Sequence, residues 1–288
     1  AVVTTSGSAV GNLLPAAIEA DRSCQPLILI TADRPERLKN CGANQTVNQE
    51  EFLMPVCRGI EQGPKKGFHL CSALDLENLA NRIWGKCHHF PGPVHCNIPF
   101  EEPLHASLGE QKAVWNTWLP QAFKKKKRFI RSKKNEFDIL SCDLSFLDPL
   151  RPGIIIVGPW RGSPKDLIGF KEAVRSFQST TSWPIFADPL SGLGDDQPGL
   201  IYHWELLINA GFSLPSGLSV LRLGPLPASR KLENWLIKVG KKQLLITEGD
   251  SRYLDPLGLS IQLSIGMASW WQKFSHVFST TIEEISDE

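Results

Sequence analysis

Three short stretches of this sequence carry side chains that can bind polar ligands. The turn Thr5-Ser6-Gly7 joins two hydroxyls to a glycine, and such a turn before a helix lets a ligand approach backbone N–H groups. The loop pair Asn44-Gln45 offers amides that donate and accept hydrogen bonds. The pair Arg230-Lys231 opens a predicted helix, where cations oppose the positive helix end unless an anion lies nearby. Each of the first two stretches could contact a polar ligand, and the basic pair indicates a carboxylate or phosphate ligand.

Each stretch also has an interpretation that needs no ligand. A small-residue turn commonly links a strand to a helix, adjacent amides are common in turns, and exposed basic residues need no partner. The densest group of metal-capable residues, Cys87-His88-His89 with His95-Cys96, does not match a paired zinc-ligand spacing. We therefore expect these to be structural residues at a helix end and in a strand.

The composition is that of a globular protein. The formal net charge of +1 gives no bias toward nucleic acid or membrane, and no apolar run reaches the ~18 residues needed to span a bilayer. Seven irregularly spaced cysteines indicate reduced thiols, so we expect a cytoplasmic protein, or a chloroplast one if the source is a plant. The basic run 124–128 lies in a stretch without pattern, which favours a solvated linker surface over a nucleic-acid site.

The elements that must position these residues alternate between strand and helix. In the first half, strands are predicted over 1–3, 26–31 and 93–99, with helices over 9–20 and 74–89. In the second half, strands are predicted over 153–158, 183–188, 219–224 and 243–247, with helices over 164–177 and 229–239. This alternation predicts an α/β fold of two doubly wound domains with mostly parallel sheets. Pro15 predicts a kink or a displaced start in the first helix.

The same pattern predicts the domain organisation. We expect a first domain over 1–105, a linker over 106–150 and a second domain over 151–288. Because the chain opens directly on a strand, a turn and a helix, we also expect it to be a piece of a larger soluble enzyme.

Ordered motifs along the chain resemble one enzyme family. They are 3–10 (VTTSGSAV), 30–35 (ITADRP), 41–46 (CGANQT), 92–104 (GPVHCNIPFEEPL), 187–191 (ADPLS) and 223–230 (LGPLPASR). In this order they resemble the thiamine-diphosphate-dependent MenD family, the 2-succinyl-5-enolpyruvyl-6-hydroxy-3-cyclohexene-1-carboxylate synthases. The resemblance covers nearly the whole chain except the Lys-rich linker. It implies a partial pyrimidine-binding domain over 1–105 and a middle, transhydrogenase-III-like domain over 151–288.

The resemblance also implies an activity. Family members are transferases that decarboxylate 2-oxoglutarate and add the succinic semialdehyde unit to isochorismate, in menaquinone or phylloquinone biosynthesis. The cofactors would be thiamine diphosphate, which supplies the carbanion chemistry, and Mg²⁺. The partners would be these two dicarboxylates and further copies of the chain in a homodimer or tetramer, since active sites of the family form between subunits. No nucleic acid or membrane partner is expected.

Site residues follow from the same resemblance. Asn44 and Gln45 match loop amides that contact substrate and the cofactor-bound intermediate, which gives Gln45 a catalytic role. The turn Thr5-Ser6-Gly7 matches a wall of the aminopyrimidine pocket, a cofactor-binding role. Arg230 and Lys231 match a basic pair that reaches toward substrate carboxylates. That pair usually reads Lys-Arg or Ser-Lys in the family and reads Arg-Lys here, so the charge is kept while the position of the guanidinium group differs.

Two parts of the family pattern are expected outside this chain. The segment with the catalytic glutamate would precede Ala1, and the Gly-Asp…Asn motif for diphosphate and Mg²⁺ is unmatched, since no asparagine follows Asn234. We therefore expect no metal site here and an inactive fragment. The alternatives are a non-catalytic binding or regulatory protein that keeps two α/β domains, and another thiamine-diphosphate-dependent decarboxylase or synthase. The segment 226–230 (LPASR) argues against the latter.

Overall fold

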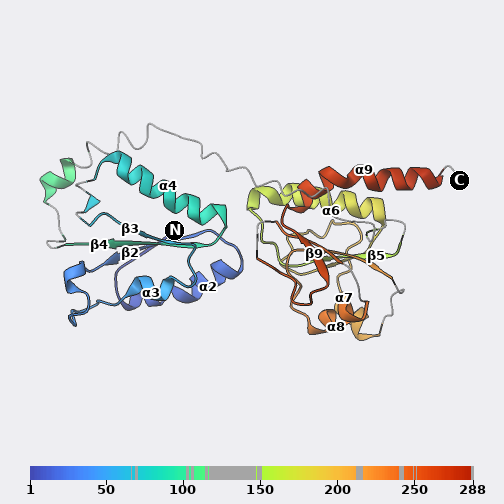
Figure 1. The fold of residues 1–288 in the computed structure, drawn as a ribbon, viewed down its shortest axis with the longest axis horizontal. Helices are drawn as coiled ribbons and strands as arrows, with labels where there is room; N and C mark the ends of the chain where they lie inside the picture. Colours follow the sequence, from blue (N-terminus) through green and yellow to red (C-terminus); the bar gives the residue numbers. More distant parts are fainter. Residues whose placement is uncertain are drawn as a thin grey trace. The chain divides into compact units, whose positions relative to one another are not determined.

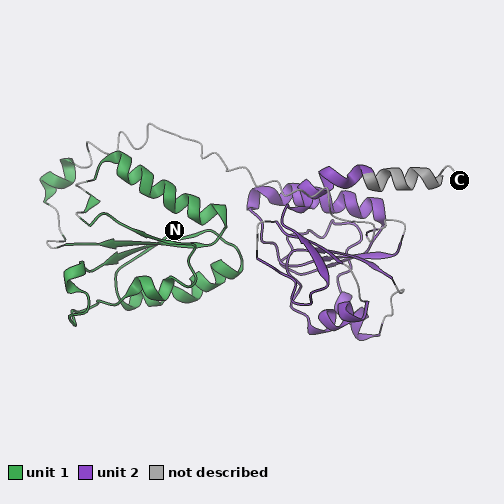
Figure 2. Cartoon of the chain, in the orientation of Figure 1, with its two compact units in different colours: residues 1–135 green, residues 136–288 purple. Residues whose placement is uncertain are grey.

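The chain forms two compact units, residues 1–135 and 136–288, in a computed structural model (Figure 2). The structure describes residues 1–65, 67–68, 71–101, 104, 107–113, 116, 147, 151–211, 217–239, 243–248, 250 and 252–286, with side chains described through residue 276. Most of the predicted linker lies outside these residues, and so does the basic run 124–128. The domain limits drawn from the sequence stay predictions.

The first unit is built on a parallel sheet with the strand order β1-β2-β4-β3. Its strands are β1 (Val2–Thr4), β2 (Leu27–Asp33), β3 (Ile60–Gln62) and β4 (Pro93–Pro99). The register places Thr4 beside Thr31, and Thr31 beside Asn97. Because parallel strands end at the same edge, polar residues near the ends of β1, β2 and β4 lie side by side.

Helices cover both faces of this sheet. They are α1 (Ser8–Gly11), α2 (Leu14–Arg22), α3 (Gln49–Leu53) and α4 (Ala73–His89). Figure 1 shows α4 on one face and α2 with α3 on the other. A capping box between Ser72 and Asp75 starts α4, which buries Leu79, Ile83 and Cys87 against the sheet. The first predicted helix divides into α1 and α2, and Pro15 lies in the first turn of α2, where its missing N–H leaves no hydrogen bond unmade. The displaced helix start is confirmed.

The second unit is built on a five-stranded parallel sheet with the order β6-β5-β7-β8-β9. Its strands are β5 (Gly153–Val157), β6 (Ile185–Ala187), β7 (Ser219–Leu223), β8 (Gln243–Ile246) and β9 (Ser260–Leu263). From β5 the chain first adds β6 on one side and then returns to add β7 on the other. The strand order therefore reverses between β5 and β7, which is where open α/β sheets bind ligands.

Helices again cover both faces. They are α6 (Leu167–Thr181), α7 (Trp204–Asn209), α8 (Arg230–Val239) and α9 (Met267–Ser286). Figure 1 shows α6 with α9 on one face of the sheet and α7 with α8 on the other. All strand pairs described in the two units are parallel, so the α/β fold of two doubly wound domains is confirmed. None of the described helices is both long and apolar enough to cross a membrane.

Candidate functional site

Gln45 is tied to the turn after β1 by three hydrogen bonds. Its Nε2 donates to Thr5 Oγ1 at 2.9 Å and to the Ser6 carbonyl oxygen at 3.1 Å. Ser6 Oγ donates in turn to the Gln45 carbonyl oxygen at 3.1 Å. The structure therefore brings together two of the three stretches that the sequence indicated. Thr5, Ser6, Gly7 and Gln45 are called the glutamine seat below.

The backbone of Gln45 is strained. Its φ of 59° lies in the left-handed region, which costs a residue with a side chain roughly 1–2 kcal/mol. Such a residue persists where its surroundings over-determine it, and such positions cluster at functional sites. Gly7 makes the close approach possible, since a Cβ added there would lie 2.9 Å from Gln45 Cγ. Gly7 also has a φ of 81°, so glycine is needed at this position for two reasons.

The contacts of Gln45 define which way its amide points. Both N–H groups of Nε2 are used, one by Thr5 Oγ1 and one by the Ser6 carbonyl oxygen. A carbonyl oxygen can only accept, so the nitrogen and not Oε1 must face Ser6. Gln45 is exposed, and within the described part of the chain its Oε1 meets no donor. The seat therefore offers a ligand an acceptor for a hydroxyl or N–H group.

The structure shows how the residues of the turn after β1 are placed. The Gly7 N–H is not free for a ligand, because it donates to Gln49 Oε1 at 3.2 Å. A buried side chain of the protein therefore satisfies this N–H group, and the cofactor-binding role of the turn stays a prediction. Ser6 and Gly7 are buried, so within the turn the side chain of Thr5 is the one open to solvent. Asn44 is exposed next to Gln45, and its carbonyl oxygen accepts from Thr46 Oγ1 at 3.2 Å.

A polar network lies at the carboxyl ends of β2 and β4. Its members, called the strand-end network, are Thr31, Asp33, Lys39, Gln49, Glu50, His95 and Asn97. Thr31, Gln49, His95 and Asn97 are each 0% exposed. The motifs of the sequence do not predict this network. The available signal was the set of polar residues inside otherwise apolar strands.

The charges in this network are paired. Lys39 Nζ lies 3.2 Å from both Asp33 Oδ2 and Glu50 Oε2, and Asn97 Nδ2 donates to both carboxylates. Burial by itself lowers the pKa of Lys39, but hydrogen bonds to Glu50 and Asp33 outweigh it and raise that pKa. Burial by itself raises the pKa of Glu50, but hydrogen bonds from Gln62 and Lys39 outweigh it and lower that pKa. Lys39 and Glu50 are therefore charged at neutral pH.

His95 is the titratable group most changed by its surroundings in the strand-end network. Its Nε2 lies 2.7 Å from Thr31 Oγ1. Burial lowers the pKa of His95 to about 4, although the carboxylates of Glu50 and Asp33 act in the opposite direction. The imidazole is therefore neutral at pH 7, where it belongs to the packed strand β4.

The residues that could have bound a metal make ordinary contacts. Cys87 Sγ lies 3.3 Å from the Gly92 carbonyl oxygen, and His88 stacks on Trp84 with ring centroids 3.9 Å apart. Within the described residues, no group of three or more His, Cys, Asp or Glu side chains could hold a metal ion. The six described cysteines are free thiols. Burial raises the pKa of Cys57 to about 12 and that of Cys96 to about 11, so neither is a nucleophile at neutral pH.

Arg230 and Lys231 begin α8 in the second unit. Ser229 caps this helix, since its Oγ accepts from the Leu232 N–H at 3.4 Å. Arg230 is 87% exposed at its side chain and lies 3.3 Å from Glu233 Oε2. Glu233 thus offsets the cations within the first turn, and the helix needs no bound anion. The two basic residues belong to a different unit from Gln45, and their role stays a prediction.

The carboxyl ends of the second sheet are closed by backbone contact. A Cβ added to Gly158, after β5, would lie 1.5 Å from the Pro225 carbonyl oxygen, after β7. The two loops therefore touch at the position where the strand order reverses. The cavity beside them, lined by Trp160 and Leu254 among others, has a volume of about 10 Å³, room for one water molecule.

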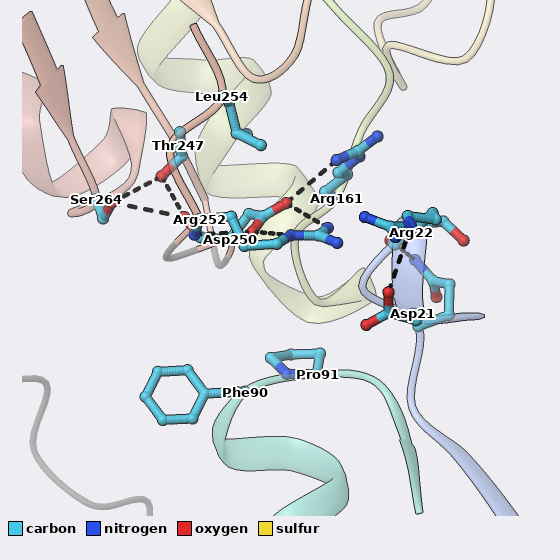
Figure 3. Close-up of polar contacts among 12 residues, drawn as sticks. Asp21, Arg22, Phe90, Pro91, Arg161, Thr247, Asp250, Arg252, Leu254 and Ser264 are labelled. Atoms are coloured by element: carbon cyan, nitrogen blue, oxygen red, sulfur yellow. Dashed lines mark hydrogen bonds and ion pairs between the residues drawn. The ribbon is translucent and has the colours of Figure 1, made fainter. Parts of the chain in front are cut away.

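Ion pairs and hydrogen bonds of Asp250 hold the loop that follows β8 in place (Figure 3). Arg161 Nη1 lies 3.1 Å from Asp250 Oδ2, and Arg252 Nη2 lies 2.7 Å from the same oxygen. Thr247 Oγ1 donates to the Asp250 carbonyl oxygen at 2.8 Å. These contacts hold the ends of β5 and β8 together and leave Asp250 2% exposed.

A second ion pair lies deeper in the same unit. Arg222, in β7, donates through Nη1 to Asp255 Oδ1 at 2.7 Å, and the two side chains are 1% and 0% exposed. Burial by itself raises the pKa of Asp255, but hydrogen bonds from Arg222 and Ser260 outweigh it and lower the pKa to about 2. Removing either partner would leave the other charge buried.

The chain is similar over nearly its whole length to several proteins named 2-succinyl-5-enolpyruvyl-6-hydroxy-3-cyclohexene-1-carboxylate synthase. It is 56% identical over 281 residues to the one from Prochlorococcus marinus (strain MIT 9313), covering 96% of this chain and 48% of that protein. It is 55% identical over 275 residues to the one from Prochlorococcus marinus (strain MIT 9303), covering 94% of this chain and 47% of that protein.

A relative from Synechococcus sp. (strain WH7803) carries the same name and is 52% identical over 273 residues, covering 94% of this chain and 46% of that protein. The chain thus spans about half the length of the curated relatives it matches. No family model matches the chain.

Proposed function

We propose that this chain, whose resemblance to the MenD family of synthases is confirmed over nearly its whole length, is part of a carboligase of that family. The proposed reaction decarboxylates 2-oxoglutarate and adds the succinic semialdehyde unit to isochorismate, in menaquinone or phylloquinone biosynthesis. The observation that carries the proposal is the 56% identity over 96% of the chain. Because the chain spans about half the length of that relative, we propose that it contributes part of the active site of the whole protein.

Within this proposal, the glutamine seat contacts the substrate. Gln45 is strained and exposed, and its Oε1 is open to a donor. Isochorismate carries a hydroxyl group, which can donate to such an oxygen. We therefore assign Gln45 a catalytic role as a hydrogen-bond acceptor, with the exposed amide of Asn44 as a second substrate contact.

In this proposal, the basic pair of the second unit binds the carboxylates of the substrates. Both proposed substrates are dicarboxylates, which need cations or strong donors for tight binding. Arg230 and Lys231 are exposed at the start of α8, so their charges are available to a ligand. Arg230 would exchange its contact with Glu233 for a substrate carboxylate.

The described residues fit only part of the expected cofactor. Thiamine diphosphate would supply the carbanion chemistry when bound. Thr5 is the exposed residue of the proposed aminopyrimidine wall, and Ser6 and Gly7, which follow it in the turn, are buried. Mg²⁺ does not fit the described residues, because they contain no cluster of metal ligands. We therefore propose no step that involves the metal or the diphosphate in this chain.

The proposal can be tested with a chimera. This chain would replace the matching residues of the synthase from Prochlorococcus marinus (strain MIT 9313), and the assay would follow consumption of isochorismate in the presence of 2-oxoglutarate. We expect an active chimera whose kcat/KM falls about 10²-fold in Gln45→Ala, because a misplaced or missing site contact has that scale of effect.

The matched control is Gln25→Ala. Gln25 is also exposed, and among the described residues its side chain donates a hydrogen bond to the Ser23 carbonyl oxygen alone, so kcat/KM should not change. A folded chimera without activity would contradict the proposal. Binding of isochorismate by the chain without turnover in the chimera would support the non-catalytic alternative instead.

The chain by itself provides a second test. Calorimetric titration of the 288 residues with thiamine diphosphate and Mg²⁺ should show no tight binding, since the described residues offer no metal ligands. Micromolar affinity would contradict the proposal that the chain alone is inactive.

A further inference from the structure

The glutamine seat depends on Gln49, a residue that lies beneath it. We propose that Gln49 is a positioning residue, which holds Gln45 in its left-handed conformation with Oε1 open to a ligand. The proposal rests on the proposed function of Gln45. It assigns a role to a fully buried residue that the sequence motifs do not include.

Gln49 reaches the seat through Gly7. Its Oε1 accepts the Gly7 N–H at 3.2 Å. Gly7 in turn lies directly against Gln45, because the space where a Cβ would stand is only 2.9 Å from Gln45 Cγ and 3.2 Å from the Gln45 carbonyl oxygen. Because there is no free space between these two residues, a shift of Gly7 moves Gln45.

Gln49 is anchored at its other end to the sheet. Its Nε2 donates to the Ala32 carbonyl oxygen at 2.8 Å and to Asn97 Oδ1 at 2.5 Å, and lies 3.2 Å from Thr31 Oγ1. The Ala32 contact defines the amide orientation, because a carbonyl oxygen only accepts. Oε1 must therefore face Gly7, and the side chain links the turn after β1 to the ends of β2 and β4.

The backbone of Gln49 closes the same loop. Gln49 is the first residue of α3, and its N–H donates to the Val47 carbonyl oxygen at 2.9 Å. The loop that carries Gln45 is thus held at its end by the helix that Gln49 starts and in its middle by the seat. Glutamine suits the position because it supplies one acceptor and two donors without a charge. A carboxylate there would face the acceptors of Ala32 and Asn97.

A purely structural role for Gln49 makes a different prediction. A structural residue lowers stability when it is replaced, and its effect on activity adds to that of Gln45→Ala. A positioning residue acts through Gln45, so its effect on activity disappears once the Gln45 side chain is absent. Two measurements separate these cases.

The first measurement is amide hydrogen exchange in the 288-residue chain. Gln49→Met keeps the approximate volume and removes both hydrogen-bonding groups, so Gly7 N–H exchange should rise roughly tenfold, the factor expected for one lost hydrogen bond. The amides of the loop around Gln45 should exchange faster as well. Gln25→Met is the control and should change neither. Unchanged exchange at Gly7 and in the loop would overturn the proposal.

The second measurement is a double-mutant cycle in the chimera. Gln49→Met should lower kcat/KM about 10²-fold, and the double variant with Gln45→Ala should be no worse than Gln45→Ala alone. Additive losses would overturn the proposal. If Gln49→Met does not fold, Gln49→Asn retains the amide but is too short to reach both Gly7 and Ala32, and the same cycle applies.

The two measurements also separate this proposal from the proposed function. An inactive chimera with faster exchange at Gly7 and in the loop would contradict the synthase proposal and support the positioning role of Gln49. An active chimera with an additive cycle would support the synthase proposal and overturn the positioning role.

Discussion

The carboxyl ends of the two sheets differ in what they leave open. In the first unit, a buried polar network supports an exposed and strained Gln45. In the second unit, Gly158 and Pro225 bring two loops into backbone contact, and Asp250 draws Arg161 and Arg252 over the strand ends. One edge leaves a polar side chain exposed, and the other is closed by contacts within the protein.

The comparison leads us to expect that activity depends on the first edge and stability on the second. In the first unit, the strand ends carry buried amides and hydroxyls together with the paired charges of Lys39, Asp33 and Glu50, and the side chain of Gln45 is left exposed. In the second unit, Asp250 and Arg252 form an ion pair, and so do the buried Arg222 and Asp255, so these charges are neutralised within the protein. Changes near the second edge should therefore affect folding most, and changes in the seat should affect activity most.

The largest effect is expected for Gly158→Ala. The new Cβ would lie 1.5 Å from a backbone oxygen, which cannot move aside like a side chain. We expect the second unit to lose at least ~4 kcal/mol of stability, in the range reserved for severe core disruption. Urea unfolding followed by tryptophan fluorescence measures it. Gly169→Ala, in α6 with its nearest neighbour at 3.7 Å, should be neutral or slightly stabilising.

The next largest effect is expected for Arg222→Met. It leaves the buried carboxylate of Asp255 without its cation, and breaking such a pair costs about 3–5 kcal/mol. The same unfolding measurement applies. Arg175→Met is the matched control, because the Arg175–Asp196 pair is exposed and should contribute less than about 1 kcal/mol. Equal losses for the two variants would contradict the difference between buried and surface pairs.

The pH dependence should distinguish the units. The pKa of His95 falls from its ordinary 6.5 to about 4 on folding, because the folded protein keeps the imidazole neutral. The first unit therefore keeps its full stability with respect to this group above pH 6.5. It loses stability as the pH falls toward 4, on the order of 3 kcal/mol in total. Asp255 loses its contribution only below 3.8, toward its pKa of about 2. Hydrogen exchange between about pH 7 and 5 should therefore show the first unit weakening. His95→Gln should remove most of that pH dependence, and an unchanged profile would contradict it.

The smallest effect on stability is expected for Gly7→Ala. Its Cβ would lie 2.9 Å from Gln45 Cγ, a side-chain atom that can shift, and 3.2 Å from the Gln45 carbonyl oxygen, and φ at Gly7 is positive, so we expect a loss of roughly 1–2 kcal/mol. Activity in the chimera should fall as far as in Gln45→Ala, because Gln45 is displaced. A large loss of stability with normal activity would contradict the expectation that the first edge matters for activity more than for folding.

Much of the fold could be predicted from the sequence because apolar runs and their bounding prolines are local signals. The strand over 93–99 agrees with β4 residue for residue, and the strand over 153–158 differs from β5 by one residue. The strands β3 and β9 were missed because they are short and partly polar, with Gln62 and Gln262 among their residues. The helix α3 was missed because five residues hold too little periodicity.

The sequence by itself determined which residue types could meet a ligand: two loop amides, a hydroxyl-rich turn and a basic pair. Only the tertiary structure decided that Gln45 sits on the turn after β1, that Ser6 and Gly7 are covered, and that the amide of Gln45 offers an oxygen and not a nitrogen. The physical reason is the distance along the chain. Gly7 and Gln49 are 42 residues apart, and their hydrogen bond exists only because parallel strands end at one edge.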